Sequence, residues 1–229
     1  MAGHTHFDES TEEYLEAVYR LDREGPGVTT SGLAADLGVA PASVSGMLKK
    51  LAAEGYLTYE ARGHAQLTGK GLAVAVHVVR RNRLAEVFLH DVLGMPWDEV
   101  HEEACRLEHA ISDRVEQRLV AILGDPKVCP HGHPIPPADL TEPARVVARL
   151  ADAQAGTSVR IVEVVEDVPE TLRYLDRIGL RPGANVDVVE RAPLGGPITV
   201  EGTGGRHAVS LELARLIAIA PASSPALTA

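Results

Sequence analysis

The spacing of apolar residues changes along this 229-residue chain, and the change divides it into a helical part and a strand-rich part. Up to about residue 123, apart from one short hairpin, apolar side chains recur at the three- and four-residue steps of amphipathic helices. After Gly156 the period becomes two, which predicts strands. Four or five short strands there predict a small β-barrel. We therefore expect a multidomain, mainly α protein with a C-terminal barrel.

The first 70 residues have the pattern of a winged helix-turn-helix. Three helices and two strands are predicted, at residues 10–23, 32–37, 41–53, 55–59 and 64–68. Gly38 ends the second helix, and Pro41 suits the first turn of the third. Further helices are expected at residues 71–93, from 96 to an end near 105–112, at 113–123 and at 169–178, with a Pro-rich loop at 129–137 and a possible short helix at 143–150. Strands are expected at 158–165, 186–191, 198–201 and 207–211, and residues 213–219 close the fold.

The second helix of such a motif enters the major groove, and its N-terminal residues touch base edges. The candidate DNA-binding residues are Ala42, Ser43, Ser45 and Gly46 for bases, Lys49 and Lys50 for phosphates, and Arg62 and His64 at the wing tip. A winged helix that binds only protein is the alternative. Val44, Leu48 and Leu51 form the buried stripe of this helix and leave serine and lysine outside, which favours DNA.

Charge is distributed unevenly, and this also favours a DNA-binding protein. The chain carries a net charge of −10, yet residues 37–85 hold seven basic and two acidic residues. Residues 86–229 hold thirteen basic and twenty-two acidic residues. A local basic patch on an acidic body suits a protein that must not bind DNA everywhere on its surface.

Residues 101–109 carry four potential metal ligands on one face of a helix. His101, Cys105, Glu108 and His109 follow the steps i, i+4, i+7 and i+8, so they lie within an arc of roughly 100°. Imidazole, thiolate and carboxylate are donors for a divalent transition metal. Together with the winged helix, this stripe suggests a DNA-binding protein that is switched by a metal ion.

The two cysteines do not suggest a disulfide framework. Cys105 and Cys129 lie near histidines in the sequence, which favours metal ligation, although plain buried thiols are the alternative. The N-terminus lacks the pattern of a signal peptide, and no apolar run reaches the roughly 20 residues of a membrane span. We expect a cytoplasmic protein.

These motifs occur in an order that resembles one known family. The order is a Thr-Glu-x-Tyr-Leu helix, the winged helix, Arg-Leu-Ala-Glu, His-Glu-Glu-Ala-Cys-Arg-x-Glu-His and a Gly-x-Pro-Ile-Pro loop. The chain closely resembles the diphtheria toxin repressor and manganese transport regulator family of metal-dependent repressors over about residues 8–220. The resemblance implies a homodimer bound to double-stranded operator DNA, no enzymatic activity, no small organic substrate, and a C-terminal SH3-like, FeoA-type barrel.

The resemblance implies a primary regulatory site and a second site. The primary site comprises Glu13, Cys105, Glu108 and His109, with Glu16 as a further candidate. The second site comprises Glu86, His101, Cys129, His131 and Asp167, with Glu170 as a weaker candidate. Asn82 stands where the family usually has a histidine, so Cys129 and His131 are expected to replace that ligand. Surface glutamates and an ordinary loop thiol and imidazole remain the structural alternatives.

Glu13 indicates which metal is sensed. The iron-sensing branch has a thioether at this position and the manganese branch a carboxylate, and hard oxygen ligands suit Mn(II). Cys105 favours iron, so an Fe(II)-dependent repressor of the same architecture is the first alternative to a manganese sensor controlling metal-uptake genes. A thiol-based redox sensor using both cysteines and a metal-dependent hydrolase are the others. The hydrolase is disfavoured because the chain lacks His-Glu-x-x-His and a hydrolase leaves the DNA-binding domain unexplained.

The expected domains are a winged helix at 1–73, a helical dimerisation and metal-binding domain at 74–140, a linker at 141–155, the FeoA-type domain at 156–220 and a disordered tail at 221–229.

Overall fold

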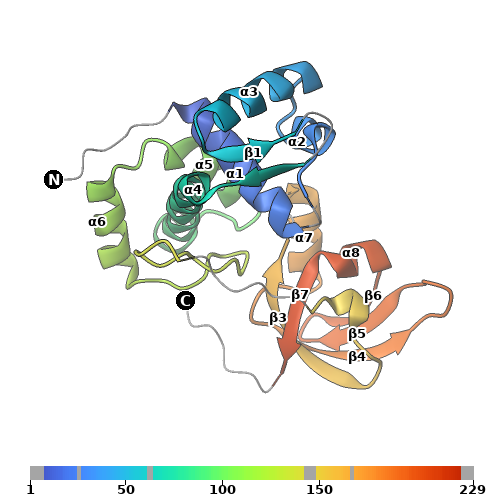
Figure 1. The fold of residues 1–229 in the computed structure, drawn as a ribbon. Coiled ribbons are helices and arrows are strands. Elements are labelled where there is room, and N and C mark those ends of the chain that lie inside the picture. Colours follow the sequence, from blue (N-terminus) through green and yellow to red (C-terminus); the bar gives the residue numbers. More distant parts are fainter. Residues whose placement is uncertain (1–7, 25–26, 61–63, 142–147, 166–167, 223–229) are drawn as a thin grey trace. The chain divides into compact units, whose positions relative to one another are not determined.

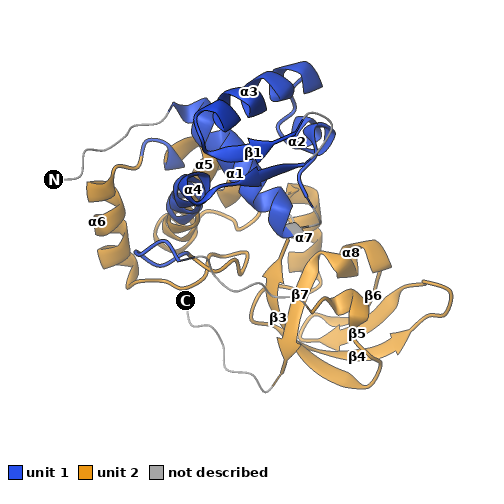
Figure 2. Cartoon of the chain, in the orientation of Figure 1, with its two compact units in different colours: residues 1–81, 108–110, 136–142 blue, residues 82–107, 111–135, 143–229 orange. Residues whose placement is uncertain are grey.

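The computed structural model describes residues 8–24, 27–60, 64–141, 148–165 and 168–222. The chain forms two compact units, which are described separately (Figure 2). The first unit contains residues 1–81, 108–110 and 136–142, and the second contains residues 82–107, 111–135 and 143–229. The possible short helix at 143–150 and the C-terminal tail lie almost wholly outside the described residues; Leu150–Asp152 form a short 3-10 turn.

The first unit has the predicted winged helix-turn-helix (Figure 1). Its elements are α1 (Glu9–Glu24), α2 (Thr30–Asp36), α3 (Pro41–Ala53), β1 (Leu57–Tyr59), β2 (Ala65–Leu67) and the start of α4 (Gly69–Val87). Leu15, Leu33, Leu48 and Leu51 are fully buried in one apolar cluster, as the helical spacing predicts.

Local sequence determines where these elements begin. The Thr29 hydroxyl accepts a hydrogen bond from the Gly32 amide and caps α2, and Pro41 occupies the first turn of α3. At Gly71, in the first turn of α4, a Cβ atom would lie 1.9 Å from the Tyr56 carbonyl oxygen. Only glycine therefore lets α4 pack this closely against the chain that leads into the wing.

The helical part of the second unit surrounds two small apolar clusters. The long helix predicted at 71–93 continues past α4 as a π-helical turn, η1 (Phe88–Val92), and is followed by α5 (Val100–Glu108) and α6 (Asp113–Leu123). The Ser112 hydroxyl caps α6, and Gly124 ends it with a φ of 75°. Leu84, Val87, Cys129 and Ile135 form one cluster, which joins the Pro-rich loop to α4.

The C-terminal part of the second unit is a five-stranded antiparallel sheet with two helices (Figure 1). Its strands are β3 (Thr157–Val164), β4 (Asn185–Arg191), β5 (Ile198–Gly202), β6 (Gly205–Val209) and β7 (Ile217–Pro221), in the order β6-β5-β4-β3-β7. Its helices are α7 (Pro169–Arg177) and α8 (Leu211–Arg215). Residues 213–219, expected as one closing element, thus end α8 and enter β7.

The predicted barrel is not closed among the described residues, because the edge strands β6 and β7 share no ladder there. The core explains why closure is unnecessary: Leu172 and Leu175 of α7 and Ala214 of α8 lie in the same apolar cluster as the sheet residues. Helices, rather than a pairing between β6 and β7, cover the apolar face.

The Pro-rich loop after α6 is fastened to β3 within the second unit. The Val164 amide donates a hydrogen bond of 2.9 Å to the His131 carbonyl, and His133 Nδ1 lies 2.9 Å from Glu163 Oε1. Gly132 has a φ of 85°, and a Cβ atom there would lie 2.0 Å from the Val162 carbonyl oxygen. A loop that carries candidate metal ligands is therefore held against the C-terminal sheet.

Within the described part of the chain, none of the helices combines the length and apolarity that crossing a bilayer requires.

Candidate metal centres and DNA-binding surface

The face of α3 that the sequence assigns to DNA is open to solvent. Ala42, Ser43, Gly46, Lys49 and Lys50 are exposed, and so is His64 beside the wing. Ser45 is half-buried and its hydroxyl donates to the Pro41 carbonyl at 3.0 Å. Lys50 Nζ lies 3.4 Å from Asp8 Oδ2. Arg62 lies outside the described residues.

His109 lies between two glutamates of the first unit, and we call Glu12, Glu108 and His109 the His109 cluster. Nδ1 of His109 is 2.7 Å from Glu12 Oε2, which comes from α1. Nε2 is 3.2 Å from Glu108 Oε1, at the end of α5. The side chains are 13% exposed for Glu12, 3% for Glu108 and 15% for His109. Two carboxylates thus converge on opposite nitrogens of one imidazole.

The acidic surroundings make His109 more basic than usual. Its hydrogen bond to Glu12 raises the pKa of His109 above its ordinary value, although burial acts in the opposite direction. The negative charges of Glu16 and Glu9 raise this pKa further. A positive charge on or beside the imidazole is therefore stabilised here.

The structure brings a different glutamate of α1 to His109 from the one predicted as a metal ligand. Glu12 contacts His109, whereas the predicted ligand Glu13 is exposed and Glu16 is half-buried. Adjacent helical residues point about 100° apart, so Glu12 and Glu13 leave α1 in different directions. The burial of Thr11, Leu15 and Val18 sets the rotation of α1 and so determines which glutamate reaches His109.

Cys105 lies in the second unit, one turn before Glu108 on α5. Its Sγ accepts a hydrogen bond of 3.5 Å from Asn82 Nδ2 and lies 3.6 Å from His101 Nε2. Nδ1 of His101 is 3.1 Å from Glu86 Oε1. Asn82, which departs from the family pattern, is thus connected through Cys105 and His101 to Glu86.

Glu86, Cys129 and His131 form a second group, which we call the Glu86 cluster. One potential ligand atom from each residue lies within 4.8 Å of the other two, and all three residues are buried. Glu86 Oε1 is 3.4 Å from His131 Nδ1, while Oε2 is buried and has no hydrogen-bond partner among the described residues. Three of the five residues predicted for the second site are therefore brought together, and His101 adjoins them through Glu86. Asp167 lies outside the described residues, and Glu170 lies on α7.

Burial and pairing act in opposite directions on the acids of this cluster. Burial alone would raise the pKa of Glu86, but hydrogen bonds from His101 and His131 hold it well below its usual range. Burial raises the pKa of the Cys129 thiol well above its usual value, and the nearby charge of Glu86 adds to the effect. The cluster therefore holds a buried negative charge on Glu86 beside a thiol that is hard to ionise, and a bound cation would stabilise the negative charge of both groups.

The imidazole of His131 provides a test of whether a metal fits the Glu86 cluster. Nε2 is 2.8 Å from the Trp97 carbonyl oxygen, and Nδ1 faces Glu86 Oε1. A neutral imidazole has one N–H, so only one of these two acceptors can receive a hydrogen bond. When Nε2–H donates to Trp97, a metal ion could take the place of a proton at Nδ1, beside the Glu86 carboxylate. Together with the unpartnered Glu86 Oε2, the donor set fits a divalent cation.

The indole of Trp97 borders this cluster. Its ring centroid lies 5.4 Å from that of His131, and the Arg181 guanidinium lies 5.0 Å from the Trp97 ring centroid. Trp97 is also part of the apolar core of the C-terminal sheet. The Glu86 cluster is therefore in contact with that core through one residue.

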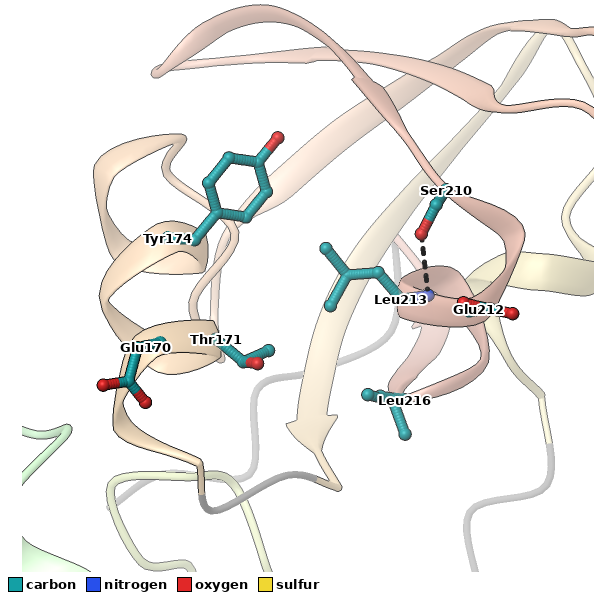
Figure 3. A pocket seen from close by; sticks show the side chains of 7 residues that line it. All are labelled: Glu170, Thr171, Tyr174, Ser210, Glu212, Leu213 and Leu216. Carbon is teal, nitrogen blue, oxygen red and sulfur yellow. Dashed lines mark hydrogen bonds between the residues drawn. The ribbon is translucent and has the colours of Figure 1, made fainter.

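A separate open hollow of about 510 Å³ lies between α7 and α8 (Figure 3). It is lined by Glu170, Thr171, Tyr174, Ser210, Glu212, Leu213 and Leu216. The Ser210 hydroxyl is used to cap α8, accepting from the Leu213 amide at 3.1 Å. Its lining includes two acidic residues, Glu170 and Glu212, but no histidine or cysteine, so its chemistry differs from that of both clusters.

Comparison with known proteins assigns each part of the chain to a described domain. Residues 6–65 match the N-terminal DNA-binding domain of iron-dependent repressors, and residues 68–137 match their metal-binding and dimerisation domain. Residues 148–221 match the FeoA domain. The iron-dependent repressor IdeR of Mycobacterium tuberculosis is 38% identical over 205 residues, covering 84% of this chain and 88% of its own length. The chain belongs to the iron-dependent repressor family.

Other members of the family support the same assignment. The diphtheria toxin repressor of Corynebacterium diphtheriae is 33% identical over 222 residues, covering 92% of this chain and 96% of its own length. A manganese-dependent transcriptional repressor solved in complex with manganese is 34% identical, with a TM-score of 0.86 and coverage of 92% of this chain and 99% of that structure. The manganese regulator SloR gives a TM-score of 0.79 at 32% identity over 92% of this chain and 98% of that structure.

The chain is accordingly a metal-dependent transcriptional repressor with DNA-binding and dimerisation domains, and not an enzyme. Its relatives include both iron and manganese repressors.

Proposed function

We propose that this repressor is activated by Mn(II) and controls genes for metal-ion uptake. The observation that carries the proposal is the acidic surroundings of His109: Glu108 contacts its Nε2 atom, and the candidate ligand Glu16 adds negative charge. Hard carboxylate oxygens suit Mn(II), which binds weakly and depends on a geometry that disfavours stronger competitors. The similar manganese-dependent repressor solved with manganese supports the same choice.

The primary site in this proposal comprises Glu13, Glu16, Cys105, Glu108 and His109. The second site comprises Glu86, Cys129 and His131 with His101, and Asp167 is its candidate ligand from the FeoA domain. The spacing of the first set on two helices and the 4.8 Å grouping within the second support these assignments. When bound, a divalent metal supplies positive charge that offsets the negative charges of the carboxylates.

The switch follows from electrostatics. Without metal, Glu13, Glu16, Glu108 and a potential Cys105 thiolate would repel one another, so α1 would be held loosely. A cation cancels this repulsion and stabilises one arrangement of the DNA-binding domains. The recognition helices of a cytoplasmic homodimer would then lie one DNA turn apart, roughly 34 Å. A ligand that favours one arrangement couples metal and DNA binding by typically ~1–3 kcal/mol.

The test compares operator binding by the metal-stripped chain as Mn(II) or Fe(II) is added under anaerobic conditions at fixed salt. Tight binding with Mn(II) at concentrations where Fe(II) fails is expected. In His109→Ala and Glu13→Ala, metal-dependent binding should be lost while circular dichroism shows the same fold. A full metal response in His109→Ala, or metal-independent operator binding by the unmodified chain, would contradict the proposal.

An Fe(II)-activated repressor is the second candidate, because the chain offers two thiols: Cys129 in the Glu86 cluster and Cys105 beside His101. The 38% identity to an iron-dependent repressor points the same way. Activation by Fe(II) but not by Mn(II) in the same titration would favour this reading. Loss of response on replacing either cysteine while metal binding is intact would instead favour a thiol redox sensor.

A further inference from the structure

The His109 imidazole has an oxygen acceptor at each nitrogen, and the two contacts differ. Glu12 Oε2 is 2.7 Å from Nδ1, which is a normal length for a charge-assisted hydrogen bond. Glu108 Oε1 is 3.2 Å from Nε2. A metal ion binds the neutral imidazole, which carries one N–H; the shorter contact favours placing that proton on Nδ1, which leaves the lone pair on Nε2 for the ion.

The longer contact has the separation expected of two ligands of one ion. Donor atoms that each lie about 2.1 Å from a metal ion, at right angles to one another, are about 3 Å apart. Nε2 of His109 and Oε1 of Glu108 fit this description at 3.2 Å. Glu12 lies on the opposite side of the ring, where its carboxylate cannot share an ion held at Nε2.

We propose that Glu12 is a positioning residue for the metal site: its carboxylate holds the proton of His109 on Nδ1 and thereby presents Nε2 to the ion beside Glu108. Metal-bound histidines commonly donate their other N–H to a carboxylate, which fixes the tautomer and makes the ligand nitrogen more basic. This role deepens the proposed function and rests on His109 being a ligand of the primary site. Glu13, the exposed neighbour of Glu12, is not required for it.

Mn(II) binding to the metal-stripped, full-length chain tests this role without DNA. The free hexa-aquo ion is followed by electron paramagnetic resonance as the protein is added. We expect Glu12→Ala to lower the affinity for one equivalent of Mn(II) by about 10–100-fold, the usual effect of removing such a carboxylate. Glu12→Gln should bind nearly as tightly as the unmodified chain, because the amide oxygen still accepts the Nδ1 proton. Wild-type affinity in Glu12→Ala would overturn the role, and so would equal losses in the two variants, which would make Glu12 a ligand.

The nitrogen that binds metal can be observed directly. In the chain labelled with 15N-histidine and loaded with 113Cd(II), the one-bond coupling to cadmium should appear on Nε2 of His109, with the proton on Nδ1. His109→Gln supplies the assignment by removing this signal. Coupling on Nδ1 would overturn the role of Glu12. If His109→Gln still bound every equivalent of Mn(II) with unchanged affinity, the primary site itself would be wrong, which is a different failure from that of Glu12 alone.

Discussion

The His109 cluster and the Glu86 cluster each hold an imidazole between two acceptors, but the acceptors differ. Each has an imidazole with a glutamate on one nitrogen and a second acceptor on the other. For His109 the second acceptor is a partly exposed carboxylate, Glu12, whereas for His131 it is the buried carbonyl of Trp97. The Glu12 carboxylate lies on a side chain that can change rotamer, whereas the Trp97 carbonyl is held by the backbone. The acceptor of His109 is therefore adjustable, and the acceptor of His131 is rigid.

The largest expected effect comes from removing the buried acid of the Glu86 cluster. Glu86→Ala leaves the Nδ1 atoms of the buried His131 and the half-buried His101 without their carboxylate. Removing one partner of a buried pair costs about 3 kcal/mol or more of unfolding free energy, whereas a partly exposed pair such as Glu12 and His109 contributes about 1 kcal/mol or less. Urea unfolding of the metal-stripped variants measures both values, and Glu86→Gln is the control that keeps the size of the side chain. Equal losses of unfolding free energy in Glu86→Ala and Glu12→Ala would contradict the difference proposed between the two clusters.

A smaller effect should follow from loosening the loop that carries Cys129 and His131. Gly132→Ala forces a side chain into a positive-φ position and against the Val162 carbonyl. We expect a loss of about 2 kcal/mol or more, since the left-handed backbone alone costs about 1–2 kcal/mol. Gly124→Ala is the matched control, because its φ is 75° but nothing lies within 4 Å of the added Cβ atom.

Gly132→Ala should also weaken metal binding at the Glu86 cluster more than at the His109 cluster, as isothermal titration of the two variants would reveal. If Gly124→Ala and Gly132→Ala behaved alike, the close approach of the loop to β3 would not contribute to the second cluster.

The smallest effect concerns the start of α1, which carries Glu12. Asp8 Oδ1 accepts a hydrogen bond of 2.8 Å from the Thr11 amide, and this contact lowers the pKa of Asp8 below 3.8. Loss of such a cap costs about 1 kcal/mol, so Asp8→Ala should lower thermal stability slightly, and Asp8→Asn should restore most of it.

The pH dependence of this cap has a definite sign. Because the pKa of Asp8 is lowered on folding, its contribution is complete above about pH 3.8 and is lost as the pH falls through the folded-state pKa. The stability difference between the unmodified chain and Asp8→Ala should therefore shrink on acidification. A difference that grew as the pH fell would contradict the assignment.

The elements of the DNA-binding domain could be predicted because local chemistry determines them. Gly38, Pro41 and the apolar spacing of 41–53 predict the observed bounds of α3, and 113–123 matches α6 for the same reason. The π-helical turn at Phe88–Val92 and the division of residues 211–221 into α8 and β7 were not predicted, since both depend on packing against distant residues.

The candidate sites were predicted in composition and less well in geometry. Histidine, cysteine and glutamate at helical spacing indicated metal chemistry, and Glu86, Cys129 and His131 were all proposed for one site. The sequence could not distinguish Glu12 from Glu13, because the rotation of α1 is determined by its buried face. Nor could it reveal the Trp97 carbonyl, since a backbone acceptor has no signature among side-chain types.

The position of Trp97 has a spectroscopic consequence. It is the only tryptophan in the chain, and its indole lies beside the His131 ring. Emission excited at the red edge of protein absorption therefore arises from one fluorophore at the border of the Glu86 cluster. Paramagnetic or heavy ions quench nearby indoles, so the native protein contains its own optical reporter for this cluster and needs no added dye.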